Sequence, residues 1–137
     1  MHHRREKEII RTDQAPKAIG PYSVGVKASH FVFTAGQIGL IPETGTIVTG
    51  GVEAETRQAL TNVRAILEEA GSSLDQVVKT TVFMIDMKEF SQMNAVYGEF
   101  FTANPPARST VQVSGLPKGA LIEIEAIALV PCEGHDD

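Results

Sequence analysis

Two segments of the chain repeat their apolar residues at the spacing of a helix. Between about Val52 and Ala70, apolar side chains recur every three or four positions and form one stripe. Gly71 follows this stripe and can end the helix in the left-handed conformation. The second segment runs from about Met87 to Phe101, and Asn104-Pro105-Pro106 cannot continue it. The two stripes comprise Ala59, Leu60, Val63, Ile66, Leu67 and Ala70, and Phe90, Met93, Tyr97, Phe100 and Phe101.

Other segments have the composition of β-strands. Four of them are rich in Val, Ile, Thr and Phe. Ile9–Thr12 and Ser23–Lys27 are candidates for edge strands, and Thr46–Val48 for a short strand after a turn. The order of strands, helix, strand, helix and strands predicts an α+β two-layer sandwich, with two helices on one face of a mixed sheet. The four longer strands are expected at Phe31–Gln37, Val77–Ile85, Arg108–Val113 and Leu121–Val130.

Alternation along the last two strands divides their side chains between two faces. We expect the apolar face to meet the helices, and we assign the mixed face to the other side of the sheet. Two helices cannot cover both faces, and large aliphatic side chains left in water would favour aggregation. We therefore expect the mixed face to be buried against other copies of the chain. The apolar face comprises Ile122, Ile124, Ala126, Ala128 and Val130, and the mixed face Glu123, Glu125, Ile127 and Leu129 with Arg108, Thr110 and Gln112.

Length and composition indicate one globular domain. The 137 residues are 42% hydrophobic and 21% charged, which excludes collagen-like, low-complexity and disordered chains. We expect a single domain over 1–137, with a flexible basic tail at 1–8 and an acidic tail at 131–137. No apolar run is long enough to span a bilayer, and we see no secretory signal. Cys132 is the only cysteine, so we expect no intrachain disulfide and a cytoplasmic location.

Charge and motif spacing tell against several functions. Residues 1–27 carry a net charge of +3 and residues 28–137 a net charge of −8, so the body of the domain would repel a phosphate backbone. No G-x-S-x-G and no glycine-rich phosphate loop occurs. His30 and His135 lack a second ligand at metal spacing. We therefore expect no metal site, no membrane partner and no nucleic-acid partner.

Two charged residues are candidates for chemistry. Arg108 follows Pro105-Pro106-Ala107, and its planar guanidinium can hold a small carboxylate by two hydrogen bonds. A structural ion pair with Glu123 or Glu125 is an equally good interpretation of Arg108. Glu123 begins its strand, where a carboxylate can order a water or take a proton. Glu125 lies deeper in the strand, as a buried structural partner would.

Two uncharged residues are weaker candidates. Tyr22 follows Gly20-Pro21 and can offer a hydroxyl from a loop, although ordinary loop packing also accounts for it. Asn94 lies on the second helix beside Phe90 and Tyr97, and a hydrogen bond to the backbone is the alternative to a role in a site.

A series of short motifs resembles one known family. The motifs keep their order from about residue 9 to residue 130, and on them the chain resembles the reactive intermediate deaminase A (RidA) family, also called YjgF-like proteins. The pair Pro-Ala-Arg-Ser and Ile-Glu-Ile-Glu-Ala is the most diagnostic. The matching stretches are Ala18-Ile-Gly-Pro-Tyr22, Phe33-Thr-Ala-Gly-Gln-Ile38, Gln58 to Asn62, Val78-Lys-Thr-Thr-Val82, Met93-Asn-Ala-Val-Tyr97, Pro106-Ala-Arg-Ser109 and Ile122-Glu-Ile-Glu-Ala-Ile127.

The resemblance implies a chorismate-mutase-like fold and a homotrimer whose sheets face inward. It implies three small-molecule sites between subunits, and hydrolysis of reactive 2-enamine and 2-imine acids, such as 2-aminoacrylate, to 2-keto acids and ammonia. The enzyme would be a 2-iminobutanoate/2-iminopropanoate deaminase acting on carbon–nitrogen bonds. No metal or organic cofactor is implied. A protonated imine carbon is already electrophilic, so a held carboxylate, a placed water and a proton route suffice.

The resemblance also implies roles for individual residues. Arg108 matches the carboxylate-binding arginine of the family, and Glu123 matches the glutamate thought to position or activate water. Tyr22 and Asn94 match further site residues, and Gly36 lies in the matching pocket-lining turn. The substrate-binding set is completed by Thr110, which stands where many members have Cys. Two departures bear on substrate range: Ala35 stands where many members have Ser, and Ser114-Gly115 where many have Ala-Arg.

Two other function classes compete with the deaminase. A non-catalytic protein that binds a small 2-keto acid would use the same Arg108. An endoribonuclease or translation inhibitor is a further alternative, but the acidic body and the lack of a histidine pair tell against it.

Overall fold

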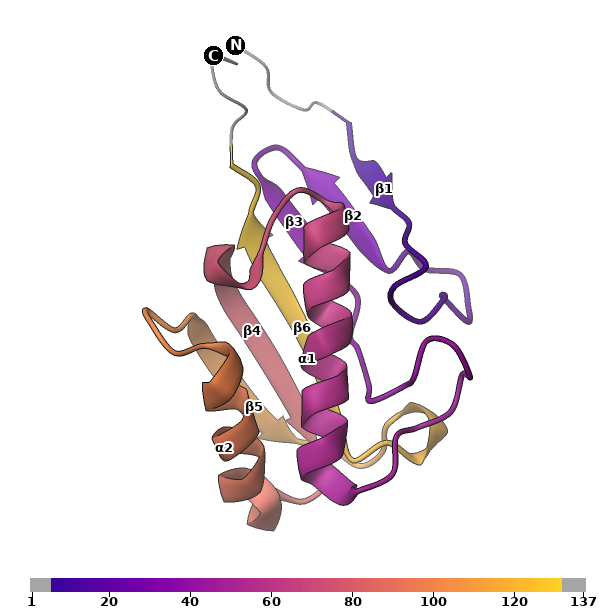
Figure 1. The fold of residues 1–137 in the computed structure, drawn as a ribbon, viewed down its shortest axis with the longest axis vertical. Helices are drawn as coiled ribbons and strands as arrows, with labels where there is room; N and C mark the ends of the chain where they lie inside the picture. The colour runs from indigo at the N-terminus through magenta and orange to yellow at the C-terminus, as the bar shows by residue number, and fades with distance from the viewer. Residues whose placement is uncertain (1–5, 132–137) are drawn as a thin grey trace.

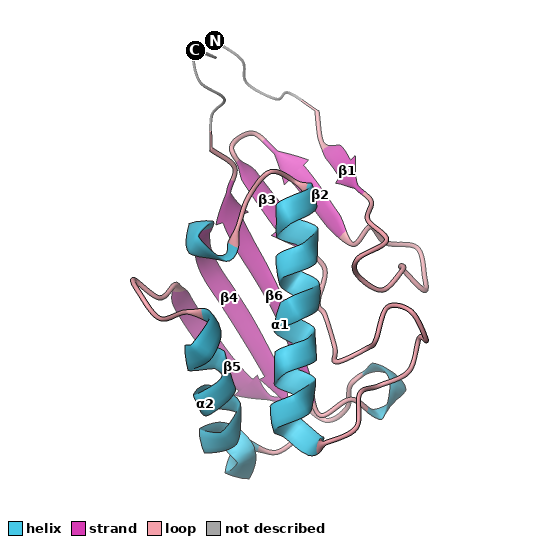
Figure 2. Cartoon of the chain, viewed as in Figure 1, coloured by secondary structure: helices cyan, strands magenta, loops and turns pink. Residues whose placement is uncertain are grey.

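The computed structural model describes residues 6–131, and the acidic tail from 132 onward, with Cys132, lies outside the described residues. It is a two-layer sandwich in which both helices lie on the same face of one six-stranded sheet (Figures 1 and 2). The elements are β1 (Glu8–Ile10), β2 (Gly25–Ala28), β3 (Phe31–Thr34), α1 (Gly51–Glu69), β4 (Val77–Met84), α2 (Phe90–Phe100), β5 (Ala107–Gln112) and β6 (Ile122–Leu129).

The sheet is mixed, as predicted. Its strand order is β1-β2-β3-β6-β4-β5, and only β4 and β5 pair in parallel. β2 pairs with both β1 and β3, so the expectation that Ser23–Lys27 is an edge strand is wrong. Glu8 pairs with Lys27, so it belongs to the sheet rather than to a tail. In place of the strand expected at Thr46–Val48 the structure has a single bridge between Ile47 and Leu40.

The helices form where their apolar stripes predict them. α1 ends at Glu69, and Gly71 follows with a φ of +86°. The Ser72 N–H then donates to the Leu67 carbonyl at 2.8 Å, which satisfies a carbonyl that the helix end leaves open. The segment expected at 87–101 divides into a short 3₁₀ turn (Met87–Glu89) and α2.

The core lies between the helix stripes and one face of the sheet. Ile122 and Ile124 of β6 are completely buried there, so the predicted assignment of this face to the helices is confirmed. Among residues 6–131, no helix is long and apolar enough to cross a membrane. The side chains that meet in the core include Leu60, Val63, Ile66 and Leu67 of α1, Met93 and Tyr97 of α2, and Val32, Val82, Met84, Ala126 and Ala128 of the sheet.

The other face of the sheet is not covered within the chain. Four of its large apolar side chains are 38–43% exposed. This agrees with the expectation that two helices leave one face of the sheet open, and no element of the described chain lies over it in Figure 1. The exposed apolar residues on this face include Phe31, Phe33, Val111 and Leu129.

The face assigned to β5 is wrong. Thr80 and Val82 of β4 are buried under the helices, and their partners in the parallel register are Arg108 and Thr110. Paired residues share a face, so Arg108 and Thr110 point toward the helix layer and not toward the open face. Gln112 follows the same alternation, and its Oε1 accepts from the Met87 N–H at 2.8 Å.

Replacing Ile124 with Asp should prevent folding. The side chain at 124 is fully buried, so the change buries an unpaired carboxylate and should lower the free energy of unfolding by about 4 kcal/mol or more. Ala103→Asp is the matched control, because Ala103 is exposed in the loop between α2 and β5, away from the open face. Circular dichroism during thermal unfolding measures both, and a stably folded Ile124→Asp protein would contradict the face assignment.

Candidate functional site

Three loops on one side of the sandwich enclose a cavity of about 300 Å³. They are the segment between β1 and β2, the segment that follows β3, and the loop before β6, and Figure 1 shows them along the side remote from β5 and α2. Three residues proposed for the site from the sequence line this cavity together: Tyr22, Gly36 and Glu123.

A bulge after β3 places Gly36 under Glu123. Between the pairs Phe33–Ile127 and Gln37–Ile124, the β3 side has one residue more than β6. A Cβ at position 36 would overlap the Glu123 carboxylate. Glycine is therefore required here for close approach, rather than for an unusual backbone conformation.

The surroundings of Glu123 favour its neutral form. Its side chain is half-buried, and burial raises its pKa above the ordinary value. The nearby Glu125 carboxylate raises the pKa of Glu123 further. A carboxyl group perturbed in this way, at the wall of a cavity, can exchange a proton with a bound molecule closer to neutral pH.

Buried polar residues of α1 fix the loop that follows Gly36 and the start of β6. The Asn62 amide donates to the carbonyls of Ile38 and Leu40, at 3.2 and 2.9 Å. The Glu55 carboxylate accepts from the Leu121 N–H at 2.8 Å, directly before β6. These two side chains were not recognised as part of the site, although polar residues on the buried side of a helix are a usable signal.

Tyr22 reaches the cavity from a tight turn. The Tyr22 N–H donates to the Gly20 carbonyl at 2.8 Å, and the Tyr22 hydroxyl accepts from the Ile19 N–H at 3.3 Å. A phenol that accepts one bond keeps its own hydrogen to donate. The side chain is half-exposed, so its hydroxyl is accessible to a ligand.

The other proposed residues form a second group at the β5 edge. Arg108 donates to the Asn94 Oδ1 at 2.8 Å. Its guanidinium lies 4.7 Å from the ring centroid of Tyr97 and 5.5 Å from that of Phe90. Tyr97 is held in turn by a 2.7 Å hydrogen bond between its hydroxyl and Thr80.

Thr110 belongs to this second group by position. It lies two residues after Arg108 on the same face of β5. Its Oγ1 is buried and has no hydrogen-bond partner within the described part of the chain. A buried hydroxyl without a partner is costly, so Thr110 is suited to meeting a group supplied from outside.

The two groups do not meet in one chain. Glu123 pairs with Phe83 of β4, whose neighbour on β5 is Val111, and all three side chains lie on the open face. Arg108 lies two strands away, about 10 Å across the sheet, and on the opposite face. The interpretation of Arg108 as a structural partner of Glu123 or Glu125 is therefore wrong within one chain. Glu125 is exposed rather than buried, so its expected structural role is wrong as well.

The described residues do not bring together a set of ligands for a metal ion. No group of three or more His, Cys, Asp or Glu side chains comes together among residues 6–131. Of the polar cavity residues, only Glu123 is a hard anionic ligand, and one carboxylate does not make a metal site.

Comparison with known proteins assigns the chain to a family. Residues 12–130 match the family described as Endoribonuclease L-PSP, which is the RidA or YjgF family. The chain is a member of this family. A RutC family protein of Pyrococcus horikoshii is 57% identical over 122 residues, which cover 89% of this chain and 97% of that protein. The predicted resemblance to RidA proteins is thereby confirmed.

Two further RidA-family relatives carry more specific names. The human protein named 2-iminobutanoate/2-iminopropanoate deaminase is 46% identical and covers 90% of each chain. The solved structure of E. coli TdcF with bound serine is 47% identical, covers 89% of this chain and 98% of that chain, and superposes with a TM-score of 0.86. The predicted α+β sandwich therefore agrees with the fold of solved RidA-family structures.

Replacing Gly36 with Ala should displace the Glu123 carboxylate. The new methyl group would occupy its place, so the carboxylate should move into water and its pKa should fall toward the ordinary value. Gly115→Ala is the control, since a Cβ there meets nothing within 4 Å. Carbon-13 NMR titration of the glutamate carboxyls measures the change. An unchanged Glu123 pKa in a folded Gly36→Ala protein would show that this contact does not hold the carboxylate.

Proposed function

We propose that this protein hydrolyses reactive 2-enamine and 2-imine acids, such as 2-aminoacrylate, to 2-keto acids and ammonia. The observation that carries the proposal is the half-buried Glu123 carboxyl over Gly36, at the wall of a cavity that Tyr22 also lines. The human relative at 46% identity is named for this chemistry. Its substrates, 2-iminobutanoate and 2-iminopropanoate, match the class proposed here.

Glu123 serves as the proton acceptor for water. Water adds to C2 of the protonated imine, and Glu123 takes the proton that the water gives up. The resulting carbinolamine loses ammonia as its C–N bond breaks, and the C–O bond becomes the carbonyl of the keto acid. Glu123 first returns its proton to the departing nitrogen, and it then takes the hydroxyl proton as the carbonyl forms and releases that proton with ammonia as ammonium. The step therefore needs no oxidant, metal or organic cofactor.

Arg108 binds the carboxylate of the substrate. Asn94 holds one guanidinium nitrogen, and the rings of Tyr97 and Phe90 fix the plane of the group. An oriented guanidinium can bind a carboxylate through two parallel hydrogen bonds. Thr110, with its unpartnered hydroxyl on the same face, is placed to contact the same ligand.

The two groups of residues come together between copies of the chain. One chain cannot bring Arg108 to Glu123, because they lie on opposite faces of the sheet. The open face carries exposed Phe31, Phe33 and Leu129, which a second copy would bury. We infer a homotrimer with three sites, each built from Glu123, Gly36 and Tyr22 of one subunit and from Arg108, Asn94 and Thr110 of its neighbour.

The ribonuclease activity in the family description fits this cavity less well. Lys17 is the one basic residue among the described residues that line it, and no histidine is among them. Cleavage of RNA by acid–base catalysis needs groups that hold a phosphate and move two protons. The cavity supplies one carboxyl and an exposed lysine for those tasks.

Two substitutions separate catalysis from binding. Glu123→Gln should lower kcat for imine hydrolysis about a hundred- to ten-thousand-fold with little change in affinity for 2-oxobutanoate. Arg108→Ala should lose affinity and turnover together, because the carboxylate is held in both the ground state and the transition state. Imine generated in the assay by a lyase, together with calorimetry of keto-acid binding, measures both.

The direction in which kcat changes with pH tests the same role of Glu123. The carboxylate form of Glu123 accepts the proton, so kcat should rise with pH through the raised pKa of Glu123 and then level off. Glu123→Gln should lack this rise. Unchanged turnover in Glu123→Gln would remove Glu123 from the mechanism, and binding of keto acids without any imine hydrolysis in the wild type would favour the non-catalytic alternative.

A further inference from the structure

The wall of the cavity at Glu123 includes one cationic side chain that the proposed reaction does not use. Lys17 lies between β1 and β2, and it lines the cavity together with Glu123. Its side chain is exposed, and the structure gives it no hydrogen bond or ion pair with another described residue. The Lys17 ammonium is therefore available to an anionic group of a ligand at the mouth of the cavity.

In the single chain, the cavity is larger than the smallest imino acids require. Its volume of about 300 Å³ equals that of about ten water molecules at their share of the liquid. Much of its wall is apolar and is formed by Ile19, Ile38 and Leu40. A substrate with a short side chain leaves this wall in contact with water, whereas a longer aliphatic side chain would cover it.

We infer that Lys17 adapts the cavity to 2-imino acids whose side chain ends in a second carboxylate, such as the imine derived from glutamate. The inference rests on the proposed function. In that arrangement Arg108 of the neighbouring subunit holds the carboxylate next to C2, and Glu123 acts at C2 itself. The end of the side chain is then the part of the substrate left to meet Lys17.

Charge and exposure set the size of the effect. An ammonium in contact with water gains little from one ion pair, so the preference should be about three- to tenfold. Because the pair is accessible to solvent, added salt should weaken the preference.

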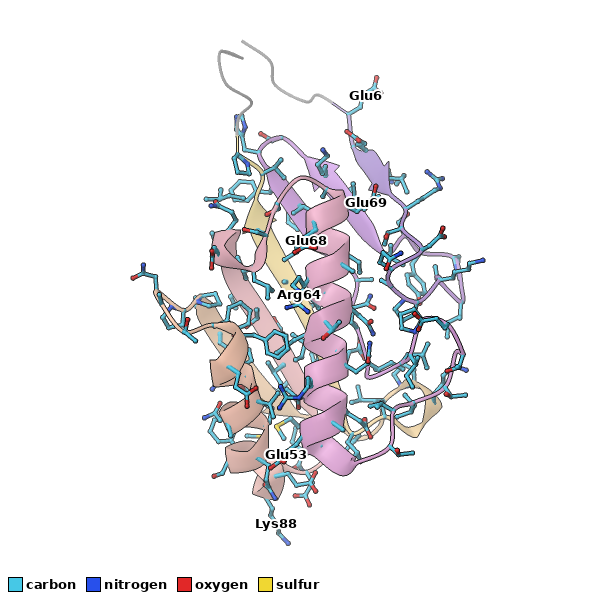
Figure 3. The ribbon with its side chains drawn as sticks, viewed as in Figure 1. Glu6, Glu53, Arg64, Glu68, Glu69 and Lys88 are labelled. Carbon is cyan, nitrogen blue, oxygen red and sulfur yellow. The ribbon has the colours of Figure 1, made fainter. Side chains whose placement is uncertain are left out.

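The test compares two imines on the same set of variants. An amino-acid oxidase generates them in the assay from glutamate and from 2-aminobutyrate, and the loss of each imine gives kcat/KM. Lys17→Gln removes the cation while it keeps a side chain of similar length. Lys88→Gln is the matched control for net charge, because Lys88 projects into solvent at the end of the molecule below α2 (Figure 3).

The expected result is a change in the ratio of the two rates. Lys17→Gln should lower kcat/KM for the glutamate-derived imine about three- to tenfold relative to the 2-aminobutyrate-derived imine, and Lys88→Gln should leave the ratio unchanged. Addition of salt to 0.5 M should reduce the wild-type ratio of the two kcat/KM values toward that of Lys17→Gln. An equal loss on both imines, or no loss on either, would overturn the inference.

A binding measurement separates this inference from the proposed function. Calorimetry with 2-oxoglutarate and 2-oxobutanoate needs no turnover. If the wild type hydrolyses neither imine, the proposed function fails, yet a preference for 2-oxoglutarate that Lys17→Gln abolishes still supports the role of Lys17. Equal affinity of the wild type for the two keto acids, or no binding of either, overturns it.

Discussion

Side chains along a β-strand alternate between the two faces of a sheet, and the register between strands decides which residues share a face. In this protein the register pairs Arg108 with the buried Thr80, and Glu123 with Phe83 on the open face. The cation and the carboxyl that we propose for imine hydrolysis are therefore separated by the sheet itself. This separation is the reason why we propose a site divided between two copies of the chain, and the uncovered apolar face would give those copies a surface to share.

Each half of the site is made rigid by a different part of the core. Asn62 and Glu55 tie the loop around Gly36 and the start of β6 to α1, which keeps the Glu123 carboxyl over the glycine. In the other half, α2 holds Arg108 through Asn94 and two aromatic rings. The two helices thus position the two halves separately, while the sheet fixes how far apart they lie. In the proposed site, each half would thus be preorganised in its own subunit before the subunits meet.

The sequence predicts the parts of the fold in which one kind of side chain repeats. The helix stripes, the stop at Gly71 and the buried face of β6 follow from such repeats. The orientation of β5 was predicted wrongly because this edge strand turns its more apolar face, with Ala107 and Val111, to the open side. Its polar face, with Arg108, Thr110 and Gln112, points toward the helices. The bulge beside Gly36 could not be predicted either, because its residues show no regular alternation of apolar and polar side chains. The motifs that resemble the RidA family contain five of the six candidate residues, all except Thr110. Only the strand register shows that Arg108 and Glu123 are on opposite faces.

Complementation between two inactive variants tests the divided site most directly. Arg108→Ala and Glu123→Gln chains are unfolded, mixed in equal amounts and refolded, and imine hydrolysis is measured on an assembly with the solution mass of a trimer. If each site takes Arg108 from one subunit and Glu123 from its neighbour, the mixture should regain about a quarter of wild-type activity. A mixture that assembles as trimers yet is no more active than either variant alone would contradict the account.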